Sequence, residues 1–182
     1  MRRIALSAGH QSLVGRDRGA VSPYGIEGNV AEELKLLVRL YLAEMGIKAS
    51  IDPKDSVTKQ TVNLFRQYFS GGDICLDIHF NSSTNPNASG TECVVPLKAT
   101  DFEKELATEL SGVISAVLNI RNRGVITEAQ TYRKKLMWMT LPCEAVLIEI
   151  CFLSNKHDME VYNLRKHEVA RNIAAVLAKY RK

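Results

Sequence analysis

Short apolar runs alternate along the chain with longer stretches in which apolar residues recur every three or four positions. The short runs predict buried strands, and the three-to-four periodicity predicts amphipathic helices. The predicted strands cover residues 4–7, 47–51, 74–80, 91–95 and 145–152, and the predicted helices cover residues 30–45, 58–69, 102–117 and 165–180. This alternation predicts an α/β fold. We expect one domain over residues 1–182, with a central, mostly parallel sheet of about six strands and helices on both faces.

Two segments interrupt this pattern. Residues 11–28 are rich in glycine and polar residues, and we expect a loop there. Residues 121–142 show no regular period apart from a short apolar run at 136–139. The strand predicted at residues 74–80 has a period of two, which places Cys75, Asp77 and His79 on one face of the sheet.

Composition and charge narrow the class of protein. The 182 residues are 46% hydrophobic and 24% charged, with a formal net charge of +4, as expected for a globular domain. No apolar run approaches the ~20 residues of a membrane span. The basic excess is small and no aromatic-interleaved basic motif accompanies it, which argues against nucleic-acid binding. The apolar run after Arg2 and Arg3 is too short for a secretory signal, so we expect synthesis in the cytoplasm without a signal peptide.

The chain contains four cysteines, Cys75, Cys93, Cys143 and Cys151, and no C-x-x-C pair. Three of them lie in or beside apolar runs that we predict as strands. We therefore expect buried free thiols in a reduced compartment, with neither a disulfide scaffold nor a thiolate zinc site.

Several polar residues lie where strands end. His10 follows the first predicted strand, His79 lies at the end of the third, and Glu27 precedes the first predicted helix. Ligands of α/β sheets bind beyond the carboxyl ends of the strands, and two imidazoles with one carboxylate are a typical ligand set of catalytic zinc. Taken singly, each histidine could be an ordinary surface or core residue, and Glu27 could be an acid favoured by the helix dipole.

Glu149 is harder to explain as a structural residue. It interrupts the apolar run at 145–152, where an ionised carboxylate costs several kcal/mol unless a cation, a metal or hydrogen bonds compensate. Asp77 raises the same question, and it could accept a hydrogen bond that orients the His79 imidazole.

Four ordered motifs give the chain a resemblance to a known family, the zinc-dependent N-acetylmuramoyl-L-alanine amidases of type 3, found in bacterial wall hydrolases and phage endolysins. The resemblance covers nearly the whole chain. The matching residues are Gly9-His10 with Asp17-Arg18-Gly19-Ala20 and Glu27; Ile78-His79-Phe80-Asn81 with Gly90-Thr91-Glu92; Arg123-Gly124-Val125; and the block Val146 to Asn155 around Glu149.

The resemblance implies zinc ligands at His10, Glu27 and His79 and a catalytic carboxylate at Glu149. Asn81 and Glu92 are weaker candidates for supporting the metal site or contacting the peptide, together with Asp77. The implied reaction is hydrolysis of the amide between N-acetylmuramic acid and L-alanine in peptidoglycan. This sequence departs from the family pattern at Ser7-Ala8, where Asp-Pro is usual, at Gln11 and Cys151, where glycine is usual, and at Asp77, where serine is common.

Two other functions stay open at this point. Another zinc peptidase or amidohydrolase, such as a carboxypeptidase, could use the same ligands, and it would need an arginine for the terminal carboxylate. A non-catalytic peptidoglycan-binding module would have lost a ligand or Glu149, and neither loss is seen. We expect a monomer that acts on the cell wall after release, as endolysins do, or a trimmed secreted catalytic domain.

Overall fold

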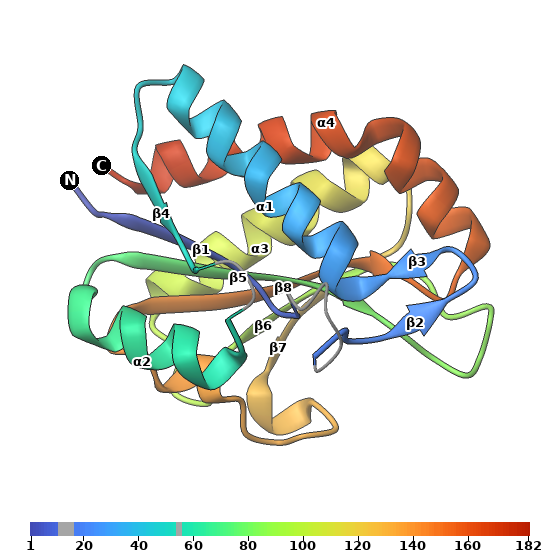
Figure 1. Cartoon of the computed structure of the whole chain (residues 1–182), viewed down its shortest axis with the longest axis horizontal. Helices are drawn as coiled ribbons and strands as arrows, with labels where there is room; N and C mark the ends of the chain where they lie inside the picture. The colour runs from blue at the N-terminus through green and yellow to red at the C-terminus, as the bar shows by residue number, and fades with distance from the viewer. Residues whose placement is uncertain (11–16, 54–55) are drawn as a thin grey trace.

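The computed structural model describes residues 1–10, 17–53 and 56–182. A six-stranded sheet forms its centre, in the order β4-β1-β5-β8-β6-β7 (Figure 1). The strands are β1 (Ile4–Ala8), β4 (Ala49–Ile51), β5 (Ile74–Asn81), β6 (Thr91–Val95), β7 (Asn122–Thr127) and β8 (Glu144–Phe152). The predicted α/β fold with a mostly parallel sheet is confirmed.

One strand pair in this sheet is antiparallel. The strands β4, β1, β5 and β8 run parallel to one another, whereas β6 pairs antiparallel with β8 and parallel with β7. The carboxyl ends of the four parallel strands therefore share one edge of the sheet, and β6 begins at that edge. This reversal brings the first residues of β6 beside the last residues of β8.

Helices cover both faces of the sheet, as predicted. α1 (Glu27–Glu44), α3 (Asp101–Leu118) and α4 (Lys156–Tyr180) pack on one face, and α2 (Thr58–Tyr68) lies on the other (Figure 1). The 3₁₀ helix η2 (Met137–Thr140) packs beside α2, and a second one, η1 (Glu128–Gln130), follows β7. No helix in the described residues is long and apolar enough to cross a membrane.

The alternation along β5 separates the main core from the site. Ile74, Leu76 and Ile78 are fully buried in the core under α1, α3 and α4. Cys75 lies on the opposite face, in a smaller cluster with Phe65 and Trp138. Because side chains alternate along a strand, Asp77 and His79 follow Cys75 onto that second face.

Some elements differ from the sequence-based prediction. α4 begins at Lys156 instead of 165, because the side chain of Asn155 accepts a hydrogen bond from the backbone N–H of Asp158 and caps the first turn. Asp158 is fully buried and accepts further hydrogen bonds from the N–H groups of Gly90 and Phe152. These first turns are rich in polar residues, so their periodicity was too weak to reveal the helix.

Two short sheet elements lie in segments predicted as irregular. β7 falls within 121–142; it is an edge strand of half-buried and exposed residues without an apolar pattern. A two-stranded hairpin, β2 (Val21–Ser22) with β3 (Gly25–Ile26), lies within the loop predicted at 11–28. Residues 11–16 of that loop, including Gln11, lie outside the described residues.

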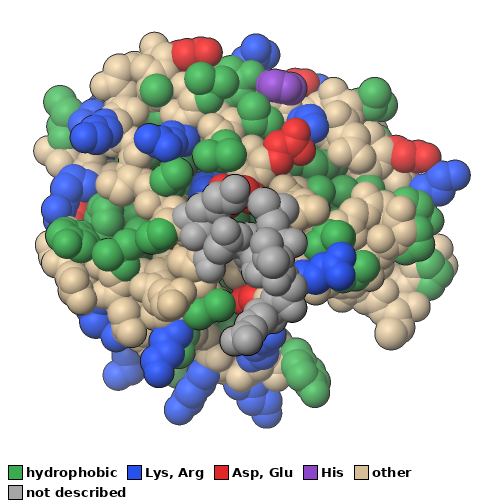
Figure 2. Space-filling view, viewed as in Figure 1, with side chains coloured by type: hydrophobic (Ala, Val, Ile, Leu, Met, Phe, Trp, Pro, Cys, Tyr) green, Lys and Arg blue, Asp and Glu red, His purple; other side chains and the backbone are tan. Residues whose placement is uncertain are grey.

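Lys and Arg side chains are spread around the face shown in Figure 2, especially along its left and lower margins.

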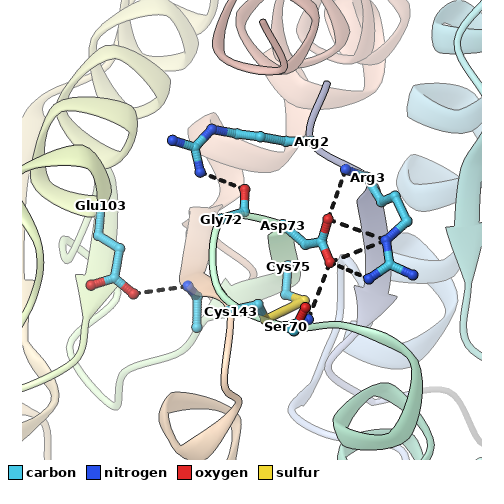
Figure 3. Close-up of a disulfide and its surroundings, with 9 residues drawn as sticks. Arg2, Arg3, Ser70, Gly72, Asp73, Cys75, Glu103 and Cys143 are labelled. Atoms are coloured by element: carbon cyan, nitrogen blue, oxygen red, sulfur yellow. Dashed lines mark hydrogen bonds and ion pairs between the residues drawn. A yellow bond between two sulfur atoms is a disulfide. The ribbon is translucent and has the colours of Figure 1, made fainter.

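The prediction of four free thiols is wrong for one pair. Cys75 and Cys143 form a disulfide (Figure 3), with their Cα atoms 6.5 Å apart, while Cys93 and Cys151 are buried free thiols. The two bonded residues are 68 positions apart in sequence. Pairing of β5 with β8 sets Cys75 opposite Ala145, two residues after Cys143, so the sheet register brings the sulfurs together.

The disulfide lies at the amino ends of β5 and β8, remote from the carboxyl edge. Ion pairing reinforces the same region: the Arg3 side chain donates to Asp73, which also accepts from the Ser70 N–H at 3.1 Å. Cys75 precedes His79 by four residues, or ~13 Å of extended strand. The bond therefore tethers the sheet without touching the residues at its carboxyl edge.

Candidate active site

A cleft of about 830 Å³ opens at the carboxyl edge of the parallel strands. His10, Glu27, His79 and Glu149 all line it. Four residues that the sequence places as much as 139 positions apart thus share one cavity. Their elements explain this: His10 follows β1, Glu27 begins α1, His79 lies near the end of β5, and Glu149 lies on β8 next to it.

His10, Glu27 and His79 form a compact cluster. Nδ1 of His79 lies 3.0 Å from Oε1 of Glu27, and Nε2 of His10 lies 3.7 Å from Oε2 of the same carboxylate. One ligand atom from each residue can be chosen so that all three lie within 4.8 Å of one another. Two imidazole nitrogens and a carboxylate oxygen at this spacing could hold a metal ion.

Each histidine is also held by an aspartate on its other nitrogen. Nδ1 of His10 lies 2.5 Å from Oδ1 of Asp17, and Nε2 of His79 lies 3.1 Å from Oδ2 of Asp77. Both rings thereby keep the nitrogen that faces Glu27 directed toward the centre of the cluster. In the sequence, Asp17 stands out only as part of the Asp-Arg-Gly-Ala motif, and its position between His10 and Glu27 is the signal that links it to the cluster.

Two glycines permit this close packing. A Cβ atom on Gly9 would lie 1.9 Å from Cε1 and Nε2 of His79. Gly19 has a φ of +65°, and a Cβ atom there would lie 2.5 Å from Oε2 of Glu27 and 2.7 Å from the His10 ring. Any side chain at either position would push into the cluster, which gives a steric reason for the glycines in the Gly-His and Gly-Ala motifs.

The electrostatics of the cluster favour the charged forms. Burial by itself would raise the pKa of Glu27, but its hydrogen bond and charge interaction with His79 outweigh burial and lower that pKa. Burial would likewise lower the pKa of His79, yet the Asp77 and Glu27 carboxylates raise it well above its ordinary value. In the metal-free protein, a positive charge is therefore favoured in the place where a cation would bind.

Glu149 lies beside the cluster and outside it. The β5–β8 register sets Glu149 opposite His79, and the antiparallel β6–β8 register sets it opposite Glu92. Part of its side chain is accessible, but its Oε2 atom is buried and has no hydrogen-bond partner among the described residues. Burial raises the pKa of Glu149 to about 7, against the opposing effect of the His79 charge. Such a carboxyl group can both accept and release a proton near neutral pH.

The remaining predicted site residues, Asn81 and Glu92, also line the cleft. Oδ1 of Asn81 accepts a hydrogen bond from the N–H of Ser82 at 2.8 Å, and its backbone carbonyl accepts one from Leu153 at 2.7 Å. Glu92 accepts a hydrogen bond from Nε of Arg123 at 3.3 Å. Asn81 therefore shapes the end of β5, whereas Glu92 contributes negative charge next to Glu149.

Comparison with known proteins identifies the family. A family model described as N-acetylmuramoyl-L-alanine amidase matches residues 4–179, which is nearly the whole chain. The chain belongs to this family. Its activity is accordingly the hydrolysis of the amide bond between N-acetylmuramic acid and L-alanine in peptidoglycan, as the sequence predicted. No curated protein sequence is significantly similar to this amidase.

Solved structures of amidases share its fold. An N-acetylmuramoyl-L-alanine amidase from Clostridium difficile 630 is 22% identical, with a TM-score of 0.78, and the match covers 99% of this chain and 97% of that one. The catalytic domain of the amidase CwlV from Bacillus (Paenibacillus) polymyxa var. colistinus is 22% identical, with a TM-score of 0.77. That match covers 99% of this chain and 98% of that one. The catalytic domain of the CD27L endolysin, which targets Clostridia difficile, is 20% identical, with a TM-score of 0.74. That match covers 99% of this chain and 96% of that one.

Proposed function

We propose that His10, Glu27 and His79 bind one zinc ion and that Glu149 is the general base and acid of the amidase reaction. The observation that carries this proposal is the cluster itself: three donor atoms from separate elements meet within 4.8 Å of one another in a cleft that also holds Glu149. Three protein ligands beside an open cleft are typical of catalytic zinc, whereas structural zinc is enclosed by four.

Zinc bound there would supply Lewis-acid polarisation of the scissile carbonyl and of the attacking water. Glu149 then carries the proton transfers. Its carboxylate accepts a proton from water as the water oxygen bonds to the carbonyl carbon, and it delivers that proton to the alanine nitrogen as the C–N bond breaks. The second transfer is required because an amide nitrogen is a poor leaving group until it is protonated. A pKa of about 7 suits both steps.

The two aspartates would act through the histidines. Asp17 and Asp77 accept hydrogen bonds from the imidazole nitrogens remote from Glu27, which fixes the ring orientation and leaves Nε2 of His10 and Nδ1 of His79 for the metal. Glu92 would help to keep the pKa of Glu149 high, since its charge lies across the strand pair. Asn81 would support the rim of the cleft beside the substrate peptide.

The place of action proposed for this amidase is the cell wall, where peptidoglycan lies. The presence of an endolysin catalytic domain among its structural neighbours supports a role in wall degradation. We propose that residues 1–182 form the catalytic domain and act as a monomer, since the cluster and Glu149 all come from one chain.

Digestion of purified peptidoglycan, with and without a chelator, tests the proposal. Mass analysis of the products should show stem peptides with a free L-alanine amino group and glycan with an intact lactyl carboxylate. Chelation should abolish release, and added zinc should restore it. A carboxypeptidase would instead release residues from the carboxyl end of the stem.

A matched variant completes the test. His79→Ala should lose both bound zinc and activity, because it removes a proposed ligand. Retained zinc in His79→Ala, or activity that survives stoichiometric loss of zinc, would refute the ligand assignment.

A further inference from the structure

The wall of the cleft carries charges of both signs. Around the zinc cluster it is lined by carboxylates, including Glu92 and Glu149. It is also lined by the segment between η1 and η2, which contributes Arg133 and Lys135. We call residues 133–135 the basic turn. Its sequence, Arg-Lys-Lys, belongs to none of the motifs that identified the family.

Hydrogen bonds within residues 128–136 shape the basic turn. Thr131 Oγ1 donates a hydrogen bond to the Glu128 carbonyl at 2.7 Å, and the Glu128 side chain accepts one from the Leu136 N–H at 2.8 Å. Lys134 has a left-handed φ of +58°, and the Lys135 N–H donates to the Arg133 carbonyl at 2.7 Å. This geometry sets residues 133 and 135 in the cleft wall, whereas Lys134 is not part of that wall.

The two basic side chains of the wall have no partners. Arg133 and Lys135 are exposed, and within the described residues neither forms a salt bridge or a side-chain hydrogen bond. Arg123, which also lines the cleft, is paired with Glu92 at 3.3 Å. Lys and Arg side chains gather along the lower margin of Figure 2, the margin toward which β7 and the following segment extend in Figure 1. Two uncommitted positive charges are thus available to a ligand in the cleft.

The substrate has an anionic group close to the bond that is cut. In the peptidoglycan stem, L-alanine is followed by a γ-linked D-glutamate, whose α-carboxyl is either free or amidated. A free α-carboxylate is stabilised where unpaired positive charge faces it. Arg133 and Lys135 are the unpaired basic groups of the described cleft wall.

We propose that Arg133 and Lys135 form a subsite for the α-carboxylate of the acidic residue that follows L-alanine in the stem peptide. The subsite directs the peptide toward the basic turn and leaves the muramoyl carbonyl at the zinc cluster. It makes the enzyme selective for stems with a free carboxylate over amidated stems. This inference rests on the zinc site and the role of Glu149 proposed above, and it adds the charge of the substrate.

Two muramoyl tripeptides that differ in one group test the subsite. Both contain N-acetylmuramoyl-L-alanyl-γ-D-glutamyl-L-lysine, one with a free α-carboxyl and the other with an α-carboxamide. Arg133→Gln and Lys135→Gln are compared with Lys134→Gln, which removes the same charge from the same turn outside the cleft wall. Hydrolysis is followed by release of the tripeptide amine, and binding is measured by calorimetry with Glu149→Gln as the inactive background.

We expect the free-carboxyl substrate to be preferred about 3- to 10-fold in kcat/KM. Arg133→Gln and Lys135→Gln should each raise KM for that substrate about 3- to 5-fold, with kcat unchanged and no change for the carboxamide. The effect should shrink in 0.5 M salt. Lys134→Gln should match the wild type on both substrates.

Three results would overturn the subsite: equal use of both substrates by the wild type, an equal loss on both substrates in the variants, or the same loss in Lys134→Gln. Equal loss on both would assign the charges to another part of the wall polymer. If neither tripeptide is hydrolysed but the free-carboxyl form still binds more tightly through Arg133 and Lys135, the proposed function fails while the subsite stands.

Discussion

Substituting Glu149 with glutamine should stabilise the metal-free enzyme while it removes activity. In the folded chain the pKa of Glu149 is raised from 4.5 to about 7, mainly by burial. A carboxyl group with a raised pKa costs stability wherever it is ionised: the cost is absent below pH 4.5, grows between pH 4.5 and 7, and is complete above pH 7. Glutamine has nearly the same size and no charge to bury.

The rise of about 2.5 units in the pKa of Glu149 sets an upper limit of about 3 kcal/mol on the destabilisation by its ionised form, at 1.36 kcal/mol per unit. Part of the side chain reaches solvent through the cleft, and we therefore expect about half, ~1.5 kcal/mol, in measured unfolding free energy. For a chain of this length, that raises Tm by about 3 to 6 °C. The gain should appear at pH 8 and vanish at pH 4.5.

The assay is thermal unfolding of chelator-treated wild type and Glu149→Gln across this pH range. Zinc content and hydrolysis rate are measured on the same two proteins without chelator. The variant should keep its zinc and lose about 10²- to 10⁴-fold in rate, because a general base is removed. Glu92→Gln is the matched control on the neighbouring strand. Its carboxylate is paired with Arg123, so it should give only a smaller gain, from the repulsion of the Glu149 carboxylate that it removes.

Two outcomes would refute this reasoning. If Glu149→Gln is less stable than the wild type at pH 8, the carboxylate has a compensating partner and its burial carries no cost. If the variant loses its zinc, Glu149 is a ligand and its role must be exchanged with that of Glu27.

The remaining predictions concern the support of the site and of the sheet. Asp77→Asn should weaken zinc binding about 10- to 100-fold in a chelator competition, because the partner of His79 Nε2 loses its charge. The circular dichroism spectrum should be unchanged. An unchanged zinc affinity would mean that Asp77 does not position the His79 ring. Reduction of the Cys75–Cys143 bond, which closes a 68-residue separation, should lower the free energy of unfolding by about 4 kcal/mol. Cys143→Ser should show the same loss without reductant, whereas titration of four free thiols in the native protein would contradict the disulfide.

The sequence by itself determined the parts of this amidase that depend on local periodicity. The period of two over residues 74–80 places Asp77 and His79 on one face of β5 in any sheet that contains the strand, and their contact in the structure follows from that geometry. The apolar run around Glu149 likewise required a buried carboxyl group. Local pattern was weakest in β7, where burial is slight, and in the first turns of α4, where the buried Asp158 is polar and charged residues surround it.

Tertiary structure decided which distant residues meet. The antiparallel placement of β6 sets Glu92 opposite Glu149, and the β5–β8 register joins Cys75 to Cys143. None of these four residues carries a local sequence signal for its partner. The basic turn is a similar case, since only the folded chain shows Arg133 and Lys135 in the same cleft as His10, Glu27 and His79. The physical reason is that periodicity records how a segment packs against an apolar core, whereas strand order and register depend on the summed pairing of segments far apart in the chain.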